Sequence, residues 1–204
     1  MEDKRDLFVR IPRAGGDHIY DWLDQCGTAS LLQQSEIPSL RVPPQHLPYN
    51  DIVALLGDAR DYAFTVVRNP YQRMEREFYC SLTQEQQKDP CKWPDFTRWV
   101  LLQISNAIVD PFYKENHFCP QSMMIGDGLD VYRLEEGLSG LQDKLQVVIN
   151  VQCSKIAEYP VDDYHDKITW TNDALSAVNR FYRTDFIKFD YAMIKPVYKS
   201  CNVV

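Results

Sequence analysis

The sequence predicts an α/β protein in which a parallel β-sheet is flanked by helices. Short apolar segments bounded by turn residues alternate along the chain with segments whose apolar residues recur at helical spacing. Two of the apolar segments, residues 7–11 and 62–67, each lead directly into a helical segment, as in the strand–helix units of parallel sheets. The chain has 204 residues, of which 45% are hydrophobic, and we expect one domain over residues 1–204.

The first half of the chain contains two such strand–helix units. In order, it is predicted to form a strand over residues 7–11, a helix over 17–25, a loop with four prolines over 35–48, a short helix over 50–56, a strand over 62–67 and a helix over 70–82. Gly27 is a helix stop, Asn50 is a candidate helix cap, and Asn69-Pro70 is typical of a helix start.

The second half is predicted to be richer in loops and helices. It is expected to form an exposed polar stretch over residues 84–92, a helix over 94–103, a long irregular segment up to Gln121, a strand over 129–133, a helix over 135–145 and a helix over 172–182 capped by Asn172. Long irregular segments in compact domains are often functional.

Composition excludes several classes of function. The net charge of −7 argues against a nucleic-acid binder, because such proteins carry a basic face. The charged stretch over residues 1–6 contains no signal peptide, and no segment predicts a membrane span, so a cytoplasmic location is expected. The six cysteines form no C-x-x-C pair and predict no zinc site, and whether they are free or form disulfide bonds stays open.

A glycine turn after the first strand is the strongest functional signal. The backbone N–H groups of such a turn and the following helix N-terminus suit a phosphate. A nucleotide kinase is disfavoured, because no Lys-Ser or Lys-Thr pair follows the glycines. The candidate anion-binding residues of this loop are Arg10, Pro12, Arg13, Ala14, Gly15, Gly16, Asp17 and His18.

A second arginine site follows the strand over residues 62–67. Arg68 comes directly after this strand, and ligands of parallel sheets bind beyond the carboxyl ends of the strands. We expect Arg68 to bind a second charged group of the same ligand, since guanidinium groups suit bidentate contacts with oxyanions. Arg73 lies a turn further along the helix and is expected to be structural.

Four segments in order resemble the motifs of membrane-type carbohydrate sulfotransferases. The chain has R-I-P-R-A-G-G at residues 10–16 where this family has H-I-P-K-T-G-G, and F-T-V-V-R-N-P-Y-Q-R at 64–73 where it has F-x-x-V-R-N-P-Y-E-R. It has N-H-F-C-P-Q at 116–121 for H-W-x-P-Q, and D-F-I-K-F-D-Y at 185–191 for D-F-x-x-F-x-Y. The resemblance implies a P-loop-like fold with three layers.

The resemblance also implies the sulfuryl donor 3′-phosphoadenosine 5′-phosphosulfate (PAPS) and a metal-independent reaction. The first loop would hold the 5′-phosphosulfate, with Arg13 in the place of the family lysine that contacts the transferring group. Arg68 would hold the 3′-phosphate, together with Arg76, which stands where the family has serine. The acceptor would be a hydroxyl of a carbohydrate or a small metabolite.

A histidine is expected to act as the general base. His46 lies in Q-H-L-P-Y, which is similar to the G-H-x-x-Y stretch that supplies the catalytic histidine of the uronyl 2-O-sulfotransferase branch. A neutral histidine near its ordinary pKa suits this task at pH 7. His117 is the alternative base.

Departures from the family pattern keep a second hypothesis open. Ala14 replaces a threonine, and Asp17 stands where the family has a hydroxyl. The Asp17 carboxylate would repel a phosphosulfate unless it turns away as the helix cap. The alternative to an enzyme is therefore a degenerate relative that binds a nucleotide or a protein partner. The acceptor and the oligomeric state are left open by the sequence.

Overall fold

The computed structural model describes residues 6–26, 40–57, 62–149, 155–156, 159 and 163–198. The predicted helix stop Gly27 and residues 35–39 of the predicted loop lie outside these ranges. The chain divides into two compact units, one of residues 1–68 and 111–161 and the other of residues 69–110 and 162–204. The single domain expected from the sequence stays a prediction.

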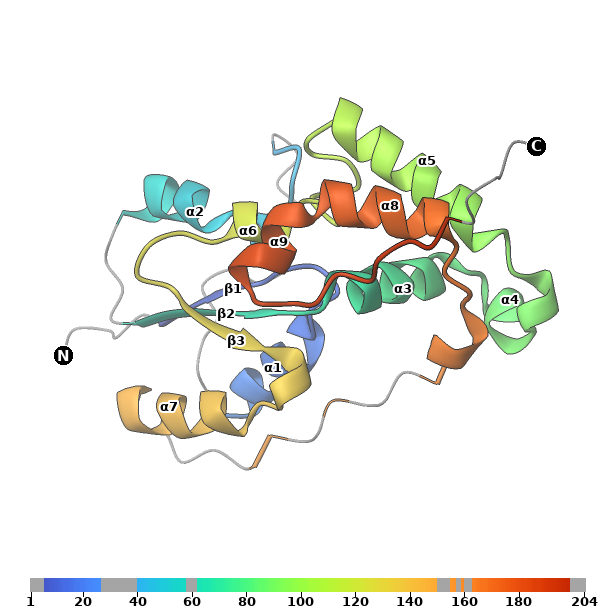
Figure 1. The fold of residues 1–204 in the computed structure, drawn as a ribbon. Coiled ribbons are helices and arrows are strands. Elements are labelled where there is room, and N and C mark those ends of the chain that lie inside the picture. The colour runs from blue at the N-terminus through green and yellow to red at the C-terminus, as the bar shows by residue number, and fades with distance from the viewer. Residues whose placement is uncertain are drawn as a thin grey trace, which may run out of the picture. The chain divides into compact units, whose positions relative to one another are not determined.

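The first unit contains the β-sheet. Its described strands are β1 (Asp6–Val9), β2 (Tyr62–Val67) and β3 (Asp130–Arg133), which pair in parallel in the order β1-β2-β3 (Figure 1). Phe8 is in register with Phe64 on the central strand, and Phe64 is in register with Asp130. The prediction of an α/β protein with parallel strands and flanking helices is confirmed.

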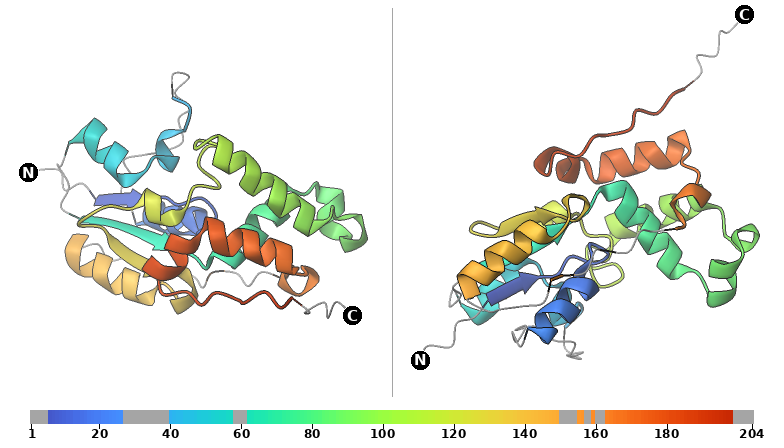
Figure 2. Two further views of the ribbon diagram at one scale, coloured as in Figure 1. Left: turned by 45° about the horizontal axis from the view of Figure 1, so that its top comes forward. Right: turned by 90° about the horizontal axis from the view of Figure 1, so that it is seen from below.

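Helices cover both faces of this sheet because the strand residues alternate in direction. On one face, Phe8 and Phe64 pack with α1 (Gly16–Gln25) and α7 (Ser139–Ile149). On the other face, Leu7 and Ala63 pack with α2 (Tyr49–Leu56). Figure 1 and the left view of Figure 2 show α2 and α7 on opposite faces of the sheet.

The carboxyl ends of the strands carry the loops that matter for function. β1 leads through the glycine turn into α1, β2 ends immediately before Arg68, and β3 leads into the short 3-10 helix η3 (Leu134–Glu136). Because all three strands are parallel, these loops emerge at the same edge of the sheet. The first unit also contains η1 (Pro44–His46) and α6 (Gln121–Met124).

Details of the first unit differ from the sequence prediction, among them the end of β1 at Val9 instead of residue 11. Asn50 is not a helix cap, because α2 begins one residue earlier and Pro48 occupies the cap position. The predicted helix over residues 135–145 is displaced, because Gly137 adopts a φ of 80° and separates η3 from α7. A positive φ interrupts a right-handed helix, and glycine adopts it without steric cost.

The second unit is helical in the part that the structure describes. Its elements are α3 (Pro70–Ser81), α4 (Gln84–Lys88), η2 (Pro90–Lys92), α5 (Phe96–Val109), η4 (His165–Lys167), α8 (Asn172–Phe181) and α9 (Arg183–Lys188). The Asn69 side chain caps α3 by accepting a hydrogen bond of 3.0 Å from the Tyr71 backbone N–H. The cap of α8 is Thr171 rather than Asn172.

Sequence periodicity underestimated the helices of this unit. α5 extends to Val109, six residues past the predicted end at residue 103, because the segment contains no proline or glycine that would stop it. α4 forms in a stretch expected to be only polar and exposed, and a reciprocal capping box between Thr83 and Gln86 supports it. No described helix is long and apolar enough to cross a membrane.

A buried carboxylate lies in the core of the second unit. Glu75 on α3 is only 3% exposed. Its Oε1 accepts a hydrogen bond of 2.6 Å from the indole N–H of Trp170, and its Oε2 pairs with Nδ1 of His165. Buried carboxylates require such donors, so these contacts join η4 and the residues after it to α3.

Candidate functional site

The glycine turn between β1 and α1 is closed by a hydrogen bond of 3.2 Å from the Ala14 N–H to the Ile11 carbonyl. Arg13 and Gly15 adopt left-handed conformations, with φ of 64° and 85°. A Cβ atom on Gly15 would lie 2.9 Å from a methyl carbon of Leu134, so only glycine fits without movement of its neighbours. α1 begins at Gly16, and its N-terminal N–H groups belong to this turn.

Arg10 and Asp17 are joined across the turn. The Arg10 stem lies over Gly16, where a Cβ atom would approach Arg10 Cγ to 2.7 Å. The Arg10 guanidinium is ion-paired with the Asp17 carboxylate, whose side chain is 78% exposed. The cap position of α1 is held by Gly15 without a side-chain hydrogen bond, so Asp17 does not turn away as the helix cap.

The other loop residues line or support the turn. Pro12 and Ala14 are buried. The His18 ring is half-buried and lies edge-on to the ring of Tyr159, with centroids 5.9 Å apart. Pro12 and Ala14 therefore act through packing and backbone shape, while His18 lies beside an aromatic group that the sequence motifs do not include.

Arg68 reaches the same turn from the end of β2. It is 4% exposed, and its Nη1 donates a hydrogen bond of 3.5 Å to the Arg13 carbonyl. Its guanidinium carbon lies 5.5 Å from the centroid of the Tyr159 ring, within cation–π distance. The first unit thus brings together the two arginine motifs that lie far apart in the sequence.

Arg76 belongs to the second unit. It lies on α3, with its guanidinium carbon 5.9 Å from the centroid of the Tyr164 ring. Its predicted contact with a 3′-phosphate stays a prediction. Arg73, on the same helix, is 3% exposed and lies 5.9 Å from the Tyr182 ring centroid, which agrees with a structural role.

The two candidate bases lie side by side in the first unit. The His46 and His117 rings are edge-on, with centroids 5.0 Å apart. His46 ends η1 and is 9% exposed, and its Nδ1 lies 3.9 Å from the carboxylate Oε2 of Glu115. Among the described residues, this buried Nδ1 has no hydrogen-bond partner.

Burial lowers the pKa of His46 to about 4 from its ordinary value of 6.5. The neighbouring His117 and the positive charges of Arg10 and Arg13 act in the same direction, and the polar backbone of Glu115 opposes them. The ring is therefore neutral at pH 7, as a base must be, but it is a weaker base than the ordinary histidine expected from the sequence. The shift also indicates that His46 lies within electrostatic reach of the arginine loop.

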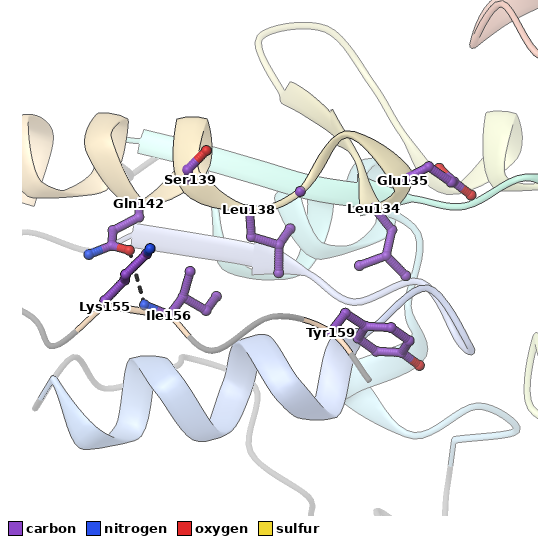
Figure 3. Close-up of a pocket in the computed structure, with 9 residues that line it drawn as sticks. Leu134, Glu135, Leu138, Ser139, Gln142, Lys155, Ile156 and Tyr159 are labelled. Carbon is purple, nitrogen blue, oxygen red and sulfur yellow. Dashed lines mark hydrogen bonds between the residues drawn. The ribbon is translucent and has the colours of Figure 1, made fainter. Parts of the chain in front are cut away.

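A pocket adjoins the glycine turn (Figure 3). Its volume is about 370 Å³, and its lining residues are Leu134, Glu135, Gly137, Leu138, Ser139, Gln142, Lys155, Ile156 and Tyr159. Figure 3 shows Leu138, which lies between η3 and α7, near Ile156, and Leu134 of η3 near Tyr159. The Ile156 N–H donates to Gln142 Oε1 at 3.0 Å. Tyr159 is shared between the pocket, the turn and Arg68.

Three residues of this site were not predicted as functional. Tyr159 carries no motif and is found only through the tertiary structure. Asn116 and Gln121 belong to the N-H-F-C-P-Q segment, but their hydrogen bonds run to the backbone of His46 and Arg68. The sequence motif therefore contained these two residues, but it did not reveal which groups they bind.

Comparisons with known proteins leave the family undetermined. No protein-family model matches the chain, no curated protein matches it, and no solved structure matches it. Within the described ranges, no group of three or more His, Cys, Asp or Glu side chains is arranged to hold a metal ion.

Proposed function

We propose that this protein is a sulfotransferase with a P-loop-like fold, which moves a sulfuryl group from PAPS to a hydroxyl of a carbohydrate or small-molecule acceptor. The observation that carries the proposal is the meeting of Arg13 and Arg68 at one glycine turn at the carboxyl edge of a parallel sheet, with the buried ring of His46 within electrostatic reach of Arg10 and Arg13. A cationic turn with a neutral histidine suits transfer from an anionic donor to a hydroxyl.

The residues of the turn fit an anionic donor. Backbone N–H groups at the start of α1 would hold the 5′-phosphosulfate, and Arg13 would neutralise its charged oxygens. Arg68 would hold the 3′-phosphate through its planar fork of N–H donors. The turn needs no hydroxyl side chain for this, since its donors are backbone groups and guanidinium groups.

The pocket beside the turn fits the purine base of the same donor. It is lined by Leu134, Leu138 and Ile156, and Tyr159 offers an aromatic face next to Arg68. Its volume of about 370 Å³ falls within the range of small-molecule sites. Polar groups of Gln142 and Ser139 lie among the lining residues and can bind the edge of a base.

In the proposed reaction the acceptor oxygen bonds to sulfur, the bond between sulfur and the 5′-phosphate oxygen breaks, and His46 takes the hydroxyl proton. Arg13 has a permanent charge and stabilises the leaving oxygen without giving up a proton. His117 packs against His46 and is the second candidate for the base. The reaction is proposed to need no metal, so chelators are expected to leave it unchanged.

A binding protein without catalytic activity is the second candidate, and the Arg10–Asp17 ion pair favours it. A carboxylate at the mouth of the turn repels an anionic donor and occupies one of the three nearby guanidinium groups. A non-catalytic relative would bind 3′-phosphoadenosine 5′-phosphate (PAP) or a protein partner without turnover.

Calorimetry with PAP tests the donor site. We expect binding in the micromolar range, weakened at least about tenfold in Arg68→Ala because a charged pair at a phosphate is lost. Arg180→Ala, which removes an exposed arginine of α8 and changes the net charge equally, is the matched control. Absence of binding at millimolar PAP would exclude the donor-site proposal.

An assay of sulfuryl transfer from PAPS to a panel of hydroxyl acceptors separates the enzyme from the binding protein. His46→Ala is expected to lower turnover about 10²- to 10⁴-fold with PAP affinity unchanged. If instead only His117→Ala lowers it, the base is His117. Magnesium-dependent ATP turnover without sulfuryl transfer would identify the protein as a nucleotide kinase.

The cytoplasmic location expected from the sequence stays a prediction, and one cysteine argues against it. Cys26 is disulfide-bonded, whereas Cys80, Cys91 and Cys119 form no disulfide bond. Disulfide bonds persist in oxidising compartments and are rare in the cytosol. Thiol alkylation of the protein from its native source, with and without reductant, would decide between the two locations.

A further inference from the structure

The segment over residues 114–121 has an unusual backbone beside the candidate base. Lys114, Glu115 and Asn116 follow one another with φ of 47°, 57° and 68°. Residues with a Cβ atom rarely enter this left-handed region, and runs of them are strained. Such strain is found mainly where the surrounding structure fixes a functional geometry.

The first contact of this segment is with His46. The Asn116 side-chain amide donates a hydrogen bond of 3.0 Å to the His46 carbonyl, and both residues are buried. The next residue, His117, packs its ring against that of His46, and the preceding residue, Glu115, faces its Nδ1. Three consecutive residues therefore contact one histidine, from its backbone to its ring.

The second contact is with Arg68. The Arg68 N–H donates to Gln121 Oε1 at 2.9 Å, and Gln121 Nε2 donates to the Arg68 carbonyl at 2.7 Å. The Gln121 side chain thus makes the two hydrogen bonds that the backbone of a neighbouring strand would make with Arg68, which lies just past the end of β2. Gln121 is fully buried, so its amide has no water to replace these bonds.

We propose that residues 114–121 form a positioning segment, in which Asn116 holds the base His46 and Gln121 holds the phosphate-binding Arg68. The inference rests on the function proposed above, because it assigns a common purpose to two residues named there. Neither Asn116 nor Gln121 touches substrate in this scheme. One short segment would keep the proton acceptor and the donor-binding cation in a fixed geometry, which sulfuryl transfer in line requires.

Two variants separate this role from simple packing. Asn116→Gly deletes the amide and tolerates the left-handed backbone, and we expect kcat to fall about 10- to 100-fold with PAP affinity within twofold. Gln121→Glu keeps the acceptor for the Arg68 N–H but loses the donor, and we expect PAP affinity to fall about tenfold or more. Gln103→Glu, at a buried glutamine of α5, is the matched control and should change neither quantity.

Nuclear magnetic resonance gives a readout that does not depend on activity. Asn116→Gly should change the imidazole signals of His46 and the pH dependence of these signals. The groups that face this ring are Glu115, His117, Arg10 and Arg13. The same variant should leave the Arg68 backbone signals in place. Gln121→Glu should do the reverse. If Gln121→Glu does not fold, Gln121→Met, which keeps the length of the side chain without its polar groups, takes its place.

The outcomes distinguish the two proposals. Wild-type protein that fails to bind PAP contradicts the proposed function, whereas the resonance experiment still tests the positioning segment. Unchanged His46 signals in Asn116→Gly and unchanged Arg68 signals in Gln121→Glu would overturn the inference. Both variants could instead lose kcat and PAP affinity together, in proportion to a loss of thermal stability. The segment would then contribute only to packing, and the inference would also be overturned.

Discussion

The carboxylate of Asp17 is ion-paired with the guanidinium of Arg10, and the pair spans the glycine turn over Gly16. Both groups lie at the N-terminal end of α1, where an anion would bind. Asp17 therefore affects an anionic ligand twice, by repelling it and by holding a cation that would attract it. Its effect on donor binding can be measured by removing the charge alone.

Asp17→Asn is expected to tighten PAP binding by about three- to tenfold, because it removes a negative charge and releases Arg10. Calorimetry at low and high salt checks this, since screening should reduce the difference. Asp21→Asn, at an exposed position one turn further along α1, is the control and should have little effect. Weaker PAP binding in Asp17→Asn would instead mean that the carboxylate holds Arg10 in a productive position.

His46 should make the stability of the protein sensitive to mild acid. Its pKa is about 4 in the folded protein against an ordinary value of 6.5. The unfolded chain binds a proton at His46 more tightly than the folded protein does. The stabilising contribution of His46 to the free energy of unfolding is therefore complete above pH 6.5 and is lost as the pH falls through 4. The shift corresponds to about 3 kcal/mol in the free energy of unfolding.

Urea unfolding between pH 7.5 and pH 4 checks this prediction. His46→Gln should lose less stability over this interval than the wild type, by about the same 3 kcal/mol. His18→Gln removes another titratable ring near the turn and serves as the control. Equal losses in wild type and His46→Gln would contradict the burial of a neutral His46.

PAP binding is expected to raise the pKa of His46. The charges of Arg10 and Arg13 contribute to its low value, and an anion on the turn neutralises them. Because proton binding and PAP binding are then linked, protonation of His46 should strengthen PAP binding as the pH falls toward the pKa that His46 has in the complex. Titration of the His46 ring signals with and without PAP measures the shift directly.

The phosphate groups of PAP also titrate, and protonation of a phosphate weakens its charge at low pH. His46→Gln retains the effect of phosphate protonation but lacks that of His46. The contribution of His46 is therefore the difference in the pH dependence of PAP affinity between wild type and His46→Gln. A His46 titration that is unchanged by saturating PAP would place the anion away from the Arg10–Arg13 loop.

In the second unit, Trp170→Phe is expected to lower the free energy of unfolding by about 1–3 kcal/mol, because the buried Glu75 carboxylate loses a hydrogen bond from the indole N–H. The cost should shrink when Glu75 is already changed to Gln, since a neutral amide needs the donor less. A double-mutant cycle in urea unfolding measures this coupling. Additive effects of the two substitutions would contradict it.

Local sequence signals predicted the parts of the fold that local chemistry determines. The strand over residues 62–67 is confirmed at both ends, since its apolar run is bounded by a polar residue and by Asn69-Pro70. Asn69 is a true helix cap. Asn50 and Asn172 have the same chemistry, but Asn172 directly follows the cap residue Thr171 and Asn50 lies two residues after the cap residue Pro48. Propensity identified the helices, and differences of one or two residues in backbone geometry decided their caps.

The candidate site was predicted in its charged residues and missed in its supporting ones. Arg68 and the glycine turn stand directly after strands, so their meeting at one sheet edge follows from parallel topology. Gln121 and Tyr159 meet Arg68 through chain segments more than 50 residues away in sequence, which periodicity cannot reveal. The low pKa of His46 likewise depends on tertiary burial.

The left-handed backbone at residues 114–116 has an evolutionary consequence. A glycine at Lys114 or Glu115 would adopt the observed φ without strain, so such a change is an accessible route to a more stable chain. The same change would loosen the segment that faces His46. Stability and activity would then select for opposite residues at these two positions, and a population evolving for robustness alone would be expected to lose the strained side chains first.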